Sequence, residues 1–300
     1  MGYNFLKGTG VALVTPFDYE GKVDFGALKR LIDYVIEGKV NYLVVQGTTG
    51  EPSTMTREEK SHVFEFVREK VNYRVPLVAG IGGNNTRELV TTLQNFDYSG
   101  FAAVLSASPY YNRPTQEGIF QHYKALAENS PLPVIIYNVP ARTASNVLGE
   151  TTLRLAHEVK NIAGIKEASG LFDQFSEILA GRPAGFMVIS GDDSTALPMI
   201  AMGADGLISV AANALPLILS RMVFNALKGD FALARLDHHQ LRIILSLIFR
   251  EGNPAGVKSL LYSIGICDPF VRLPLVAASE TLARELAVFK ELVSSVSSLF

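Results

Sequence analysis

Residues 133–166 read PVIIYNVPARTASNVLGETTLRLAHEVKNIAGIK, and this stretch contains the unit from which the fold is built. Two short apolar runs, 133–137 and 162–166, enclose a longer amphipathic segment. Short runs rich in β-branched residues, without polar alternation, are typical of parallel strands that helices cover from outside. The stretch therefore predicts a strand, a helix and a second strand.

The same alternation recurs along most of the chain. Further apolar runs lie at 10–14, 42–46, 76–81, 102–106, 186–190 and 205–209. Helix start signals stand between them: a capping box from Thr56 to Glu59, and candidate N-caps at Asp24, Thr86, Thr115 and Ser194. Eight such units predict a (β/α)₈ TIM barrel over residues 1–228, with right-handed crossovers. A doubly wound open sheet is the alternative, but the near-even spacing favours closure.

The pattern changes after residue 228. From 229 to 300 only helical periodicity is visible, with breaks at Gly252-Asn253-Pro254 and Asp268-Pro269. No stretch is rich enough in Gly, Ser or Pro to indicate a flexible linker. We expect a C-terminal helical region that packs on the barrel.

Composition excludes several classes of protein. The 300 residues are 48% hydrophobic and carry a formal net charge of −2, which gives no reason to expect a nucleic-acid or membrane partner. No apolar run approaches the roughly 20 residues that span a bilayer. The single cysteine, Cys267, and the absence of an apolar leader in MGYNFLKGTG indicate the cytoplasm. No His, Cys or carboxylate set has metal-ligand spacing, and no GxGxxG is present, so neither metal nor dinucleotide is expected.

Polar residues gather at the predicted strand ends, where barrel enzymes build their active sites. The groups are GTTGE (47–51), SPYYN (108–112), YNVP (137–140), KE (166–167) and GDD (191–193). Because the carboxyl ends of all eight strands meet at one rim, these side chains should face one another. The paired Asp192 and Asp193 could suggest a metal site, but adjacent residues diverge, which favours capping of the next helix.

Lys166 is the candidate nucleophile of this rim. Apolar residues precede it, and partial desolvation disfavours the charged form of an amine and so makes it nucleophilic. The alternative is a strand-end lysine that reaches water or pairs with Glu167. Tyr137 ends the neighbouring strand and could exchange protons with Lys166, or merely fill the barrel top. Arg142 suits a carboxylate.

Eight segments together resemble one family. They are GVALVTPF (10–17), GTTGE (47–51), SPYYNRPTQEG (108–118), YNVPART (137–143), GIKEASG (164–170), SGDD (190–193), NPAGVK (253–258) and RLPL (272–275). This sequence is similar to the dihydrodipicolinate synthase/N-acetylneuraminate lyase superfamily over almost its whole length. GTTGE, YNxP and the lysine after GI are specific when they occur together in this order.

The resemblance implies an activity without a cofactor. Lys166 would form an imine with pyruvate, and Tyr137 would donate and accept protons. Thr48 and Tyr111 resemble a proton relay in which Tyr111 comes from a neighbouring subunit, and Thr49, Gly191 and the Ile208 backbone match pyruvate-binding positions. Arg142 matches the residue that meets the carboxylate of L-aspartate-4-semialdehyde, which implies a condensation in lysine and diaminopimelate biosynthesis. The family is usually a homotetramer, a dimer of dimers.

Two other functions remain open at this stage. Cleavage by an N-acetylneuraminate lyase or a 2-keto-3-deoxy sugar-acid aldolase would use the same lysine, tyrosine and pyruvate positions, and Arg142 is the residue against it. A catalytically inactive barrel that acts as a binding or structural protein is a different class, and the presence of both Lys166 and Tyr137 counts against it.

An effector pocket for lysine is also implied, with one departure. Asn84, Glu88 and Tyr110 match it, whereas Arg57 and Lys60 align with two histidine positions of lysine-inhibited members. Two cationic side chains repel the ammonium groups of lysine. We therefore predict weak or absent inhibition by lysine.

Overall fold

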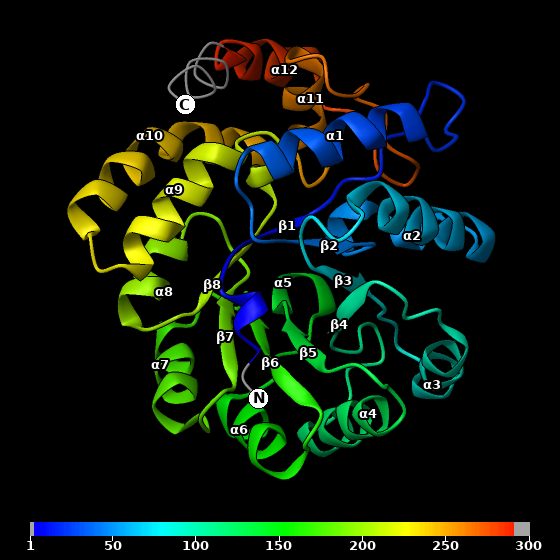
Figure 1. Ribbon diagram of the computed structural model, residues 1–300, viewed down its shortest axis with the longest axis vertical. Coiled ribbons are helices and arrows are strands. Elements are labelled where there is room, and N and C mark those ends of the chain that lie inside the picture. The colour runs from blue at the N-terminus through cyan, green and yellow to red at the C-terminus, as the bar shows by residue number, and fades with distance from the viewer. Residues whose placement is uncertain (1–2, 291–300) are drawn as a thin grey trace.

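The computed structural model of the protein describes residues 3–290 and contains a closed barrel of eight parallel strands (Figure 1). Each strand pairs with the next in sequence, and β8 pairs with β1 to close the ring. The strands are β1 (Gly8–Ala12), β2 (Tyr42–Val45), β3 (Leu77–Gly80), β4 (Phe101–Ala107), β5 (Val134–Asn138), β6 (Ile162–Glu167), β7 (Met187–Ser190) and β8 (Gly206–Ser209). The predicted (β/α)₈ barrel is confirmed. The largest difference is in β1, which begins and ends two residues earlier than predicted.

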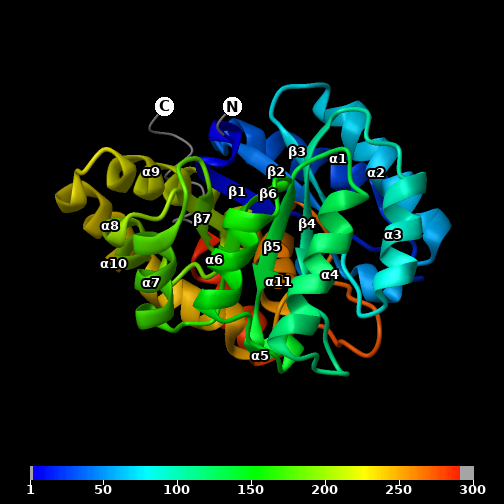
Figure 2. The same ribbon diagram turned by 90° about the horizontal axis from the view of Figure 1, so that it is seen from below.

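Helices surround the barrel and alternate with the strands. They are α1 (Phe25–Glu37), α2 (Arg57–Val71), α3 (Thr86–Asn95), α4 (Gln116–Glu128), α6 (Gly149–Glu158), α7 (Phe172–Gly181), α8 (Ala196–Met202) and α9 (Pro216–Leu227). A short helix, α5 (Pro140–Thr143), follows β5 directly. Figure 2 shows α5 and the N-terminus at opposite ends of the barrel, so α5 marks the carboxyl ends of the strands.

Strand residues alternate between two apolar cores. In β5, Ile135 and Tyr137 belong to the cluster inside the barrel, whereas Val134 and Ile136 pack between sheet and helices. In β6, Ile165 packs toward the helices. Since successive side chains of a strand point to opposite faces, the residue after Ile165 points into the barrel. This alternation is what directs a lysine at position 166 inward.

Four of the predicted helix starts can be compared with the observed caps. The side chain of Asp24 accepts from Ala27 N, that of Thr115 accepts from Gly118 N, and Thr56 forms the capping box with Glu59, as predicted. Thr86 was the wrong choice: Asn85 caps α3, and Thr86 is its first residue.

The start of α8 also differs from the prediction. Ser194 does not cap α8; instead its backbone N and that of Thr195 donate to Asp192 Oδ1 at 2.8 and 3.1 Å. Asp192 therefore closes the turn before α8, whose N-cap residue Thr195 makes no side-chain capping bond.

The chain beyond α9 contains α10 (Phe231–Arg250), α11 (Ala255–Ser263) and α12 (Glu280–Ala287). These helices gather on one side of the barrel (Figure 1). The predicted helical periodicity, with its break at Asp268-Pro269, was wrong for 264–279, which form no helix and instead bond to the segment after β2 through Arg272. The predicted helical residues 291–300 lie outside the described part of the chain. No helix within 3–290 is long and apolar enough to cross a membrane.

A buried ion pair joins this region to the barrel. Lys258 of α11 is fully buried, and its Nζ donates to Glu51 Oε1 at 2.7 Å and to Phe270 O at 2.8 Å. Its ammonium also lies over the Phe17 ring, 4.3 Å from the centroid. The second carboxylate oxygen of Glu51 accepts Arg272 N at 3.0 Å. Glu51 follows β2, so the C-terminal region holds the segment that follows that strand.

Candidate active site

Lys166 and Tyr137 lie together at the rim. They are paired across β5 and β6, and Lys166 Nζ lies over the Tyr137 ring, 4.2 Å from its centroid. Lys166 is only 4% exposed and Tyr137 only 7%. The alternative in which Lys166 reaches water or pairs with Glu167 is therefore wrong, because the lysine is buried and Glu167 follows it on the opposite face of β6. A buried amine beside a phenol is an arrangement suited to imine chemistry.

Gly191 and Ile208 complete the surroundings of the lysine. A Cβ built on Gly191 would lie 2.7 Å from Ala168 Cβ and 3.1 Å from Lys166 Cε. Only glycine leaves this space beside the lysine open. Gly191 N donates to Glu167 O at 2.8 Å, which fixes the segment after β7 against the end of β6. Ile208 is fully buried and belongs to the cluster inside the barrel with Tyr137.

The GTTGE segment forms a tight turn, a 3₁₀-helix at Thr48–Gly50. Thr48 is exposed, whereas Thr49 is buried and its Oγ1 accepts from Asn253 Nδ2 at 2.9 Å. Thr15 Oγ1 donates to Gly50 O at 2.7 Å and ties the turn to the segment after β1. The hydroxyl of Thr48 is therefore exposed to solvent, whereas that of Thr49 is fixed by Asn253.

Tyr111 and Arg142 stand apart from the buried pair. Tyr111 is 88% exposed and has a φ of 72°, a left-handed conformation that is uncommon for a tyrosine. Arg142 is exposed on α5, immediately after β5. Within the described chain, neither side chain makes a hydrogen bond to Lys166, Tyr137 or Thr48.

The two adjacent aspartates accept hydrogen bonds from different segments. Asp193 is buried and caps the segment after β8 rather than α8: Val210 N and Ala211 N donate to its Oδ2 at 3.0 and 3.1 Å, and Ser209 Oγ donates to its Oδ1. Burial raises the pKa of Asp193 to about 6. The prediction that the two residues cap the next helix is therefore wrong for both, because Asp192 accepts only from the turn that precedes α8. Residues 3–290 contain no group of three or more His, Cys, Asp or Glu that could hold a metal ion.

Three functional neighbours of the site were not assigned a role from sequence. Asn253 bonds to Thr49, Lys258 neutralises Glu51 behind the GTTGE turn, and Glu167 is buried with neutral hydrogen-bond donors. Asn253 and Lys258 both belong to the NPAGVK motif, which supported the family resemblance but gave no physical role for either residue. The partners lie 204 and 207 residues apart, which no local pattern reveals.

The five residues of the proposed effector pocket do lie near one another. Arg57 Nη2 donates to Glu88 Oε1 at 2.8 Å, and Asn84 Nδ2 donates to Tyr110 O at 3.2 Å. Burial and the charge of Arg57 lower the pKa of Lys60, and Glu88 opposes them. The carboxylate of Glu88 is therefore already paired with Arg57.

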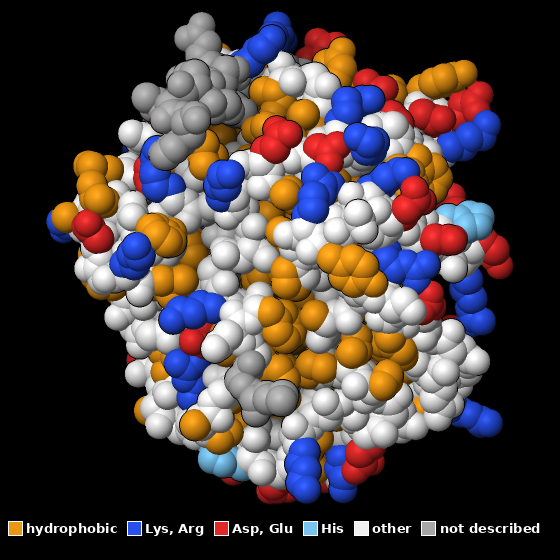
Figure 3. Space-filling model, viewed as in Figure 1, with side chains coloured by type: hydrophobic (Ala, Val, Ile, Leu, Met, Phe, Trp, Pro, Cys, Tyr) orange, Lys and Arg blue, Asp and Glu red, His pale blue; other side chains and the backbone are white. Residues whose placement is uncertain are grey.

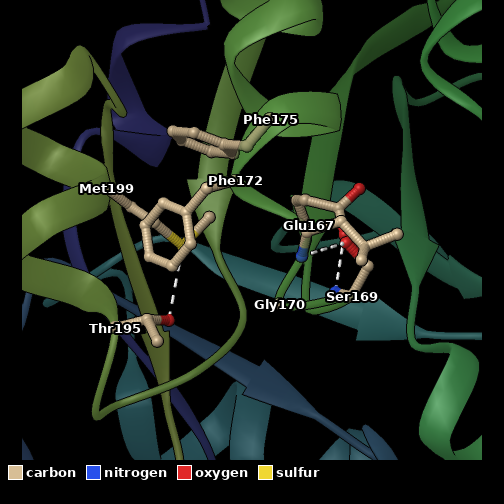
Figure 4. Close-up of a pocket in the computed structure, with 8 residues that line it drawn as sticks. Glu167, Ser169, Gly170, Phe172, Phe175, Thr195 and Met199 are labelled. Atoms are coloured by element: carbon tan, nitrogen blue, oxygen red, sulfur yellow. Dashed lines mark hydrogen bonds between the residues drawn. The ribbon is translucent and has the colours of Figure 1, made fainter.

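The charge distribution on the surface and a pocket near β6 are the last features of this region. On the face shown in Figure 3, basic and acidic side chains are interspersed, with no large area of one sign. A small open pocket lies beside the segment after β6, with Glu167 and Ser169 on one side and Phe172 and Met199 on the other (Figure 4). Lys166 and Tyr137 do not line it, so this pocket is separate from the amine.

Comparisons with known proteins identify the family of the chain. The model of the "Dihydrodipicolinate synthetase family" matches residues 5–291. A 4-hydroxy-tetrahydrodipicolinate synthase from Flavobacterium psychrophilum is 51% identical over 96% of this chain and 98% of its own. The crystal structure of a dihydrodipicolinate synthase from Aquifex aeolicus is 40% identical over 96% and 98% of the two chains, with a TM-score of 0.92. A monomeric variant of a dihydrodipicolinate synthase is 36% identical over 99% and 98%, also with a TM-score of 0.92.

Proposed function

The chain belongs to the dihydrodipicolinate synthetase family and is a lyase with 4-hydroxy-tetrahydrodipicolinate synthase activity, and we propose that it works through an imine on Lys166. The substrates are pyruvate and L-aspartate-4-semialdehyde. The observation that carries the proposal is the buried Lys166 ammonium, 4.2 Å from the centroid of the Tyr137 ring at the carboxyl end of the barrel.

The first half of the reaction activates pyruvate. The Lys166 amine attacks the ketone carbon, water leaves, and an imine forms. Loss of a methyl proton then gives an enamine, with the electrons of the broken C–H bond in the new C=C bond. Tyr137 donates and accepts these protons because its phenol lies beside the amine. The covalent imine acts as the electron sink, so this half of the reaction requires no cofactor. Thr49, Gly191 and the Ile208 backbone hold the pyruvate.

The second half joins the two substrates. The enamine carbon attacks the aldehyde carbon of the semialdehyde, and the resulting alkoxide takes a proton. The amine of the condensed product then attacks the imine carbon and displaces Lys166, which closes the ring and releases the enzyme. Arg142 binds the carboxylate of the semialdehyde, for which a guanidinium is well suited. Thr48 and Tyr111 pass the protons to solvent.

Tyr111 is best explained by a second copy of the chain. Its side chain is 88% exposed with an unusual φ of 72°, as expected for a residue that contacts another molecule. We therefore infer an assembly of at least two chains, and a homotetramer as the full form; sedimentation of an active sample as a monomer alone would contradict this. The single cysteine favours the cytoplasm.

Reductive trapping tests the imine directly. The protein is incubated with pyruvate and sodium borohydride, with and without the semialdehyde, and digested for mass spectrometry. A pyruvyl adduct on Lys166 that the semialdehyde depletes is the expected result. An adduct that ignores the semialdehyde would contradict the condensation, and absence of any adduct would contradict the imine.

Lysine is expected to inhibit the protein weakly or not at all. Arg57 occupies Glu88, and Lys60 adds a second positive charge, so a lysine ammonium meets repulsion and must displace an existing ion pair. Initial rates are measured against lysine from micromolar to millimolar concentrations. The variant Arg57→Ala frees Glu88 and should be the more sensitive of the two. Half-inhibition of the wild type at low micromolar lysine would refute this expectation.

A further inference from the structure

Glu167 is a buried carboxylate one residue from the nucleophile. It is 1% exposed and lies on the helix side of β6, opposite Lys166. Its hydrogen bonds come from neutral groups: Ser169 N at 2.6 Å, Gln174 Nε2 at 3.1 Å and Asn138 Nδ2 at 3.0 Å. A buried anion is costly unless donors compensate it. The three donors around Glu167 supply this compensation.

Asn138 makes the same connection from the neighbouring strand. It follows Tyr137 in β5 and is paired with Glu167, as Tyr137 is with Lys166. The pair of Asn138 and Glu167 is therefore the next pair along the ladder after Tyr137 and Lys166, on the opposite face of the sheet. The two pairs therefore share the same strand ends.

The network continues around a ring of four side chains. Asn138 Nδ2 also donates to Asn146 Oδ1 at 2.8 Å, Asn146 Nδ2 donates to Gln174 Oε1 at 2.8 Å, and Gln174 returns to Glu167. Val147 N donates to Asn138 Oδ1 at 3.0 Å. The ring thus joins both catalytic strands to α7 and to the segment after α5. Arg142 lies in α5, directly before that segment.

One further contact extends the ring toward Tyr111. Gln116, the first residue of α4, donates from Nε2 to Asn146 O at 2.8 Å, and its Oε1 accepts Leu148 N at 3.1 Å. The segment that carries Tyr111 ends at this helix. Every element that supplies a catalytic or semialdehyde-binding side chain on this side of the rim is therefore connected through Asn146.

We propose that Glu167, with Asn138, is a positioning residue that holds Lys166 against Tyr137 and fixes the segment of Arg142. The inference rests on the proposed function, since it concerns the same lysine and tyrosine. Glu167 touches no reacting atom. Its carboxylate gathers donors from β5, from α7 and from the segment after β6, and displacement of the reacting groups by about 1 Å costs about 10²-fold in rate.

The test is a pair of variants and their combination. Glu167→Gln turns one acceptor oxygen into a donor that faces the amides of Asn138 and Gln174, and we expect kcat to fall about 10- to 100-fold. Asn138→Asp places two carboxylates together and should be at least as damaging. In the double variant, Gln at 167 donates to Asp at 138, so a substantial part of kcat returns. Glu177→Gln, the same change at an exposed position on α7, should match the wild type.

The readout separates positioning from folding. Rates are expressed per active site, counted by the borohydride adduct, beside KM for each substrate and the urea midpoint. Lower kcat per trapped site, with partial rescue in the double variant, is the expected result. Wild-type kcat in Glu167→Gln, or no rescue, would overturn the inference. If Glu167→Gln does not fold, Gln174→Met removes one donor less drastically, and wild-type kcat there would have the same meaning. Failure of the wild type itself to form an adduct would instead reject the proposed function.

Discussion

Replacement of Lys166 by alanine is expected to lower kcat by more than about 10³-fold and to abolish the borohydride adduct with pyruvate. The amine is the only group in the proposed reaction that forms a bond to the substrate, and within residues 3–290 no other lysine ends a strand of the barrel. Turnover and adduct mass are measured on the same preparation. Lys166→Arg should be equally inactive, since a guanidinium keeps the charge but is not a nucleophile at neutral pH.

Lys160→Ala is the matched control for this change. Lys160 is exposed and lies just before β6, so its removal changes net charge equally without touching the rim. We expect normal turnover and a normal adduct. Near-normal turnover in Lys166→Ala would reject the imine mechanism altogether. An adduct that persists on another residue would show that this other residue is the nucleophile.

Local patterns were sufficient for the barrel and for the central pair. The buried runs and their near-even spacing predicted the strands, because a covered parallel strand leaves a continuous apolar signal. Lys166 and Tyr137 could be paired because strands with consecutive helices between them are neighbours in a barrel. The wrong caps arose where two capping residues stand close together, as at Asn85 and Thr86, and the sequence alone does not choose between them.

Contacts between distant segments were not predictable in the same way. Nothing near Lys258 indicates that it is fully buried, because its partner Glu51 lies 207 residues away. The helical pattern was likewise wrong for 264–279, whose backbone is held by Lys258 of α11 at Phe270 O and by Glu51 at Arg272 N. The role of Glu167 was missed because its adjacency to Lys166 suggested a pair, although strand geometry places neighbours on opposite faces.

Replacement of Lys258 by methionine is expected to lower the free energy of unfolding by about 3–5 kcal/mol. Methionine fills most of the space but leaves the Glu51 carboxylate, 1% exposed at its side chain, without its cationic partner and with only the Arg272 N–H bond. Loss of a whole buried charge partner costs far more than loss of a surface pair. Urea unfolding at fixed protein concentration measures the difference. Because Glu51 adjoins the GTTGE turn, we also expect a higher KM for pyruvate.

The double variant Lys258→Met with Glu51→Leu identifies the cause. If the cost comes from the unpaired carboxylate, removal of both charges restores most of the lost stability, since an apolar pair of similar volume avoids desolvation. Lys29→Met serves as the surface control: its ion pair with Asp33 is largely exposed, and its loss should cost within about 1 kcal/mol. A loss in Lys258→Met as small as in Lys29→Met would show that the buried pair does not hold the C-terminal region to the barrel. Restored stability with KM still raised would show that the carboxylate of Glu51 itself shapes the turn that presents Thr48 and Thr49.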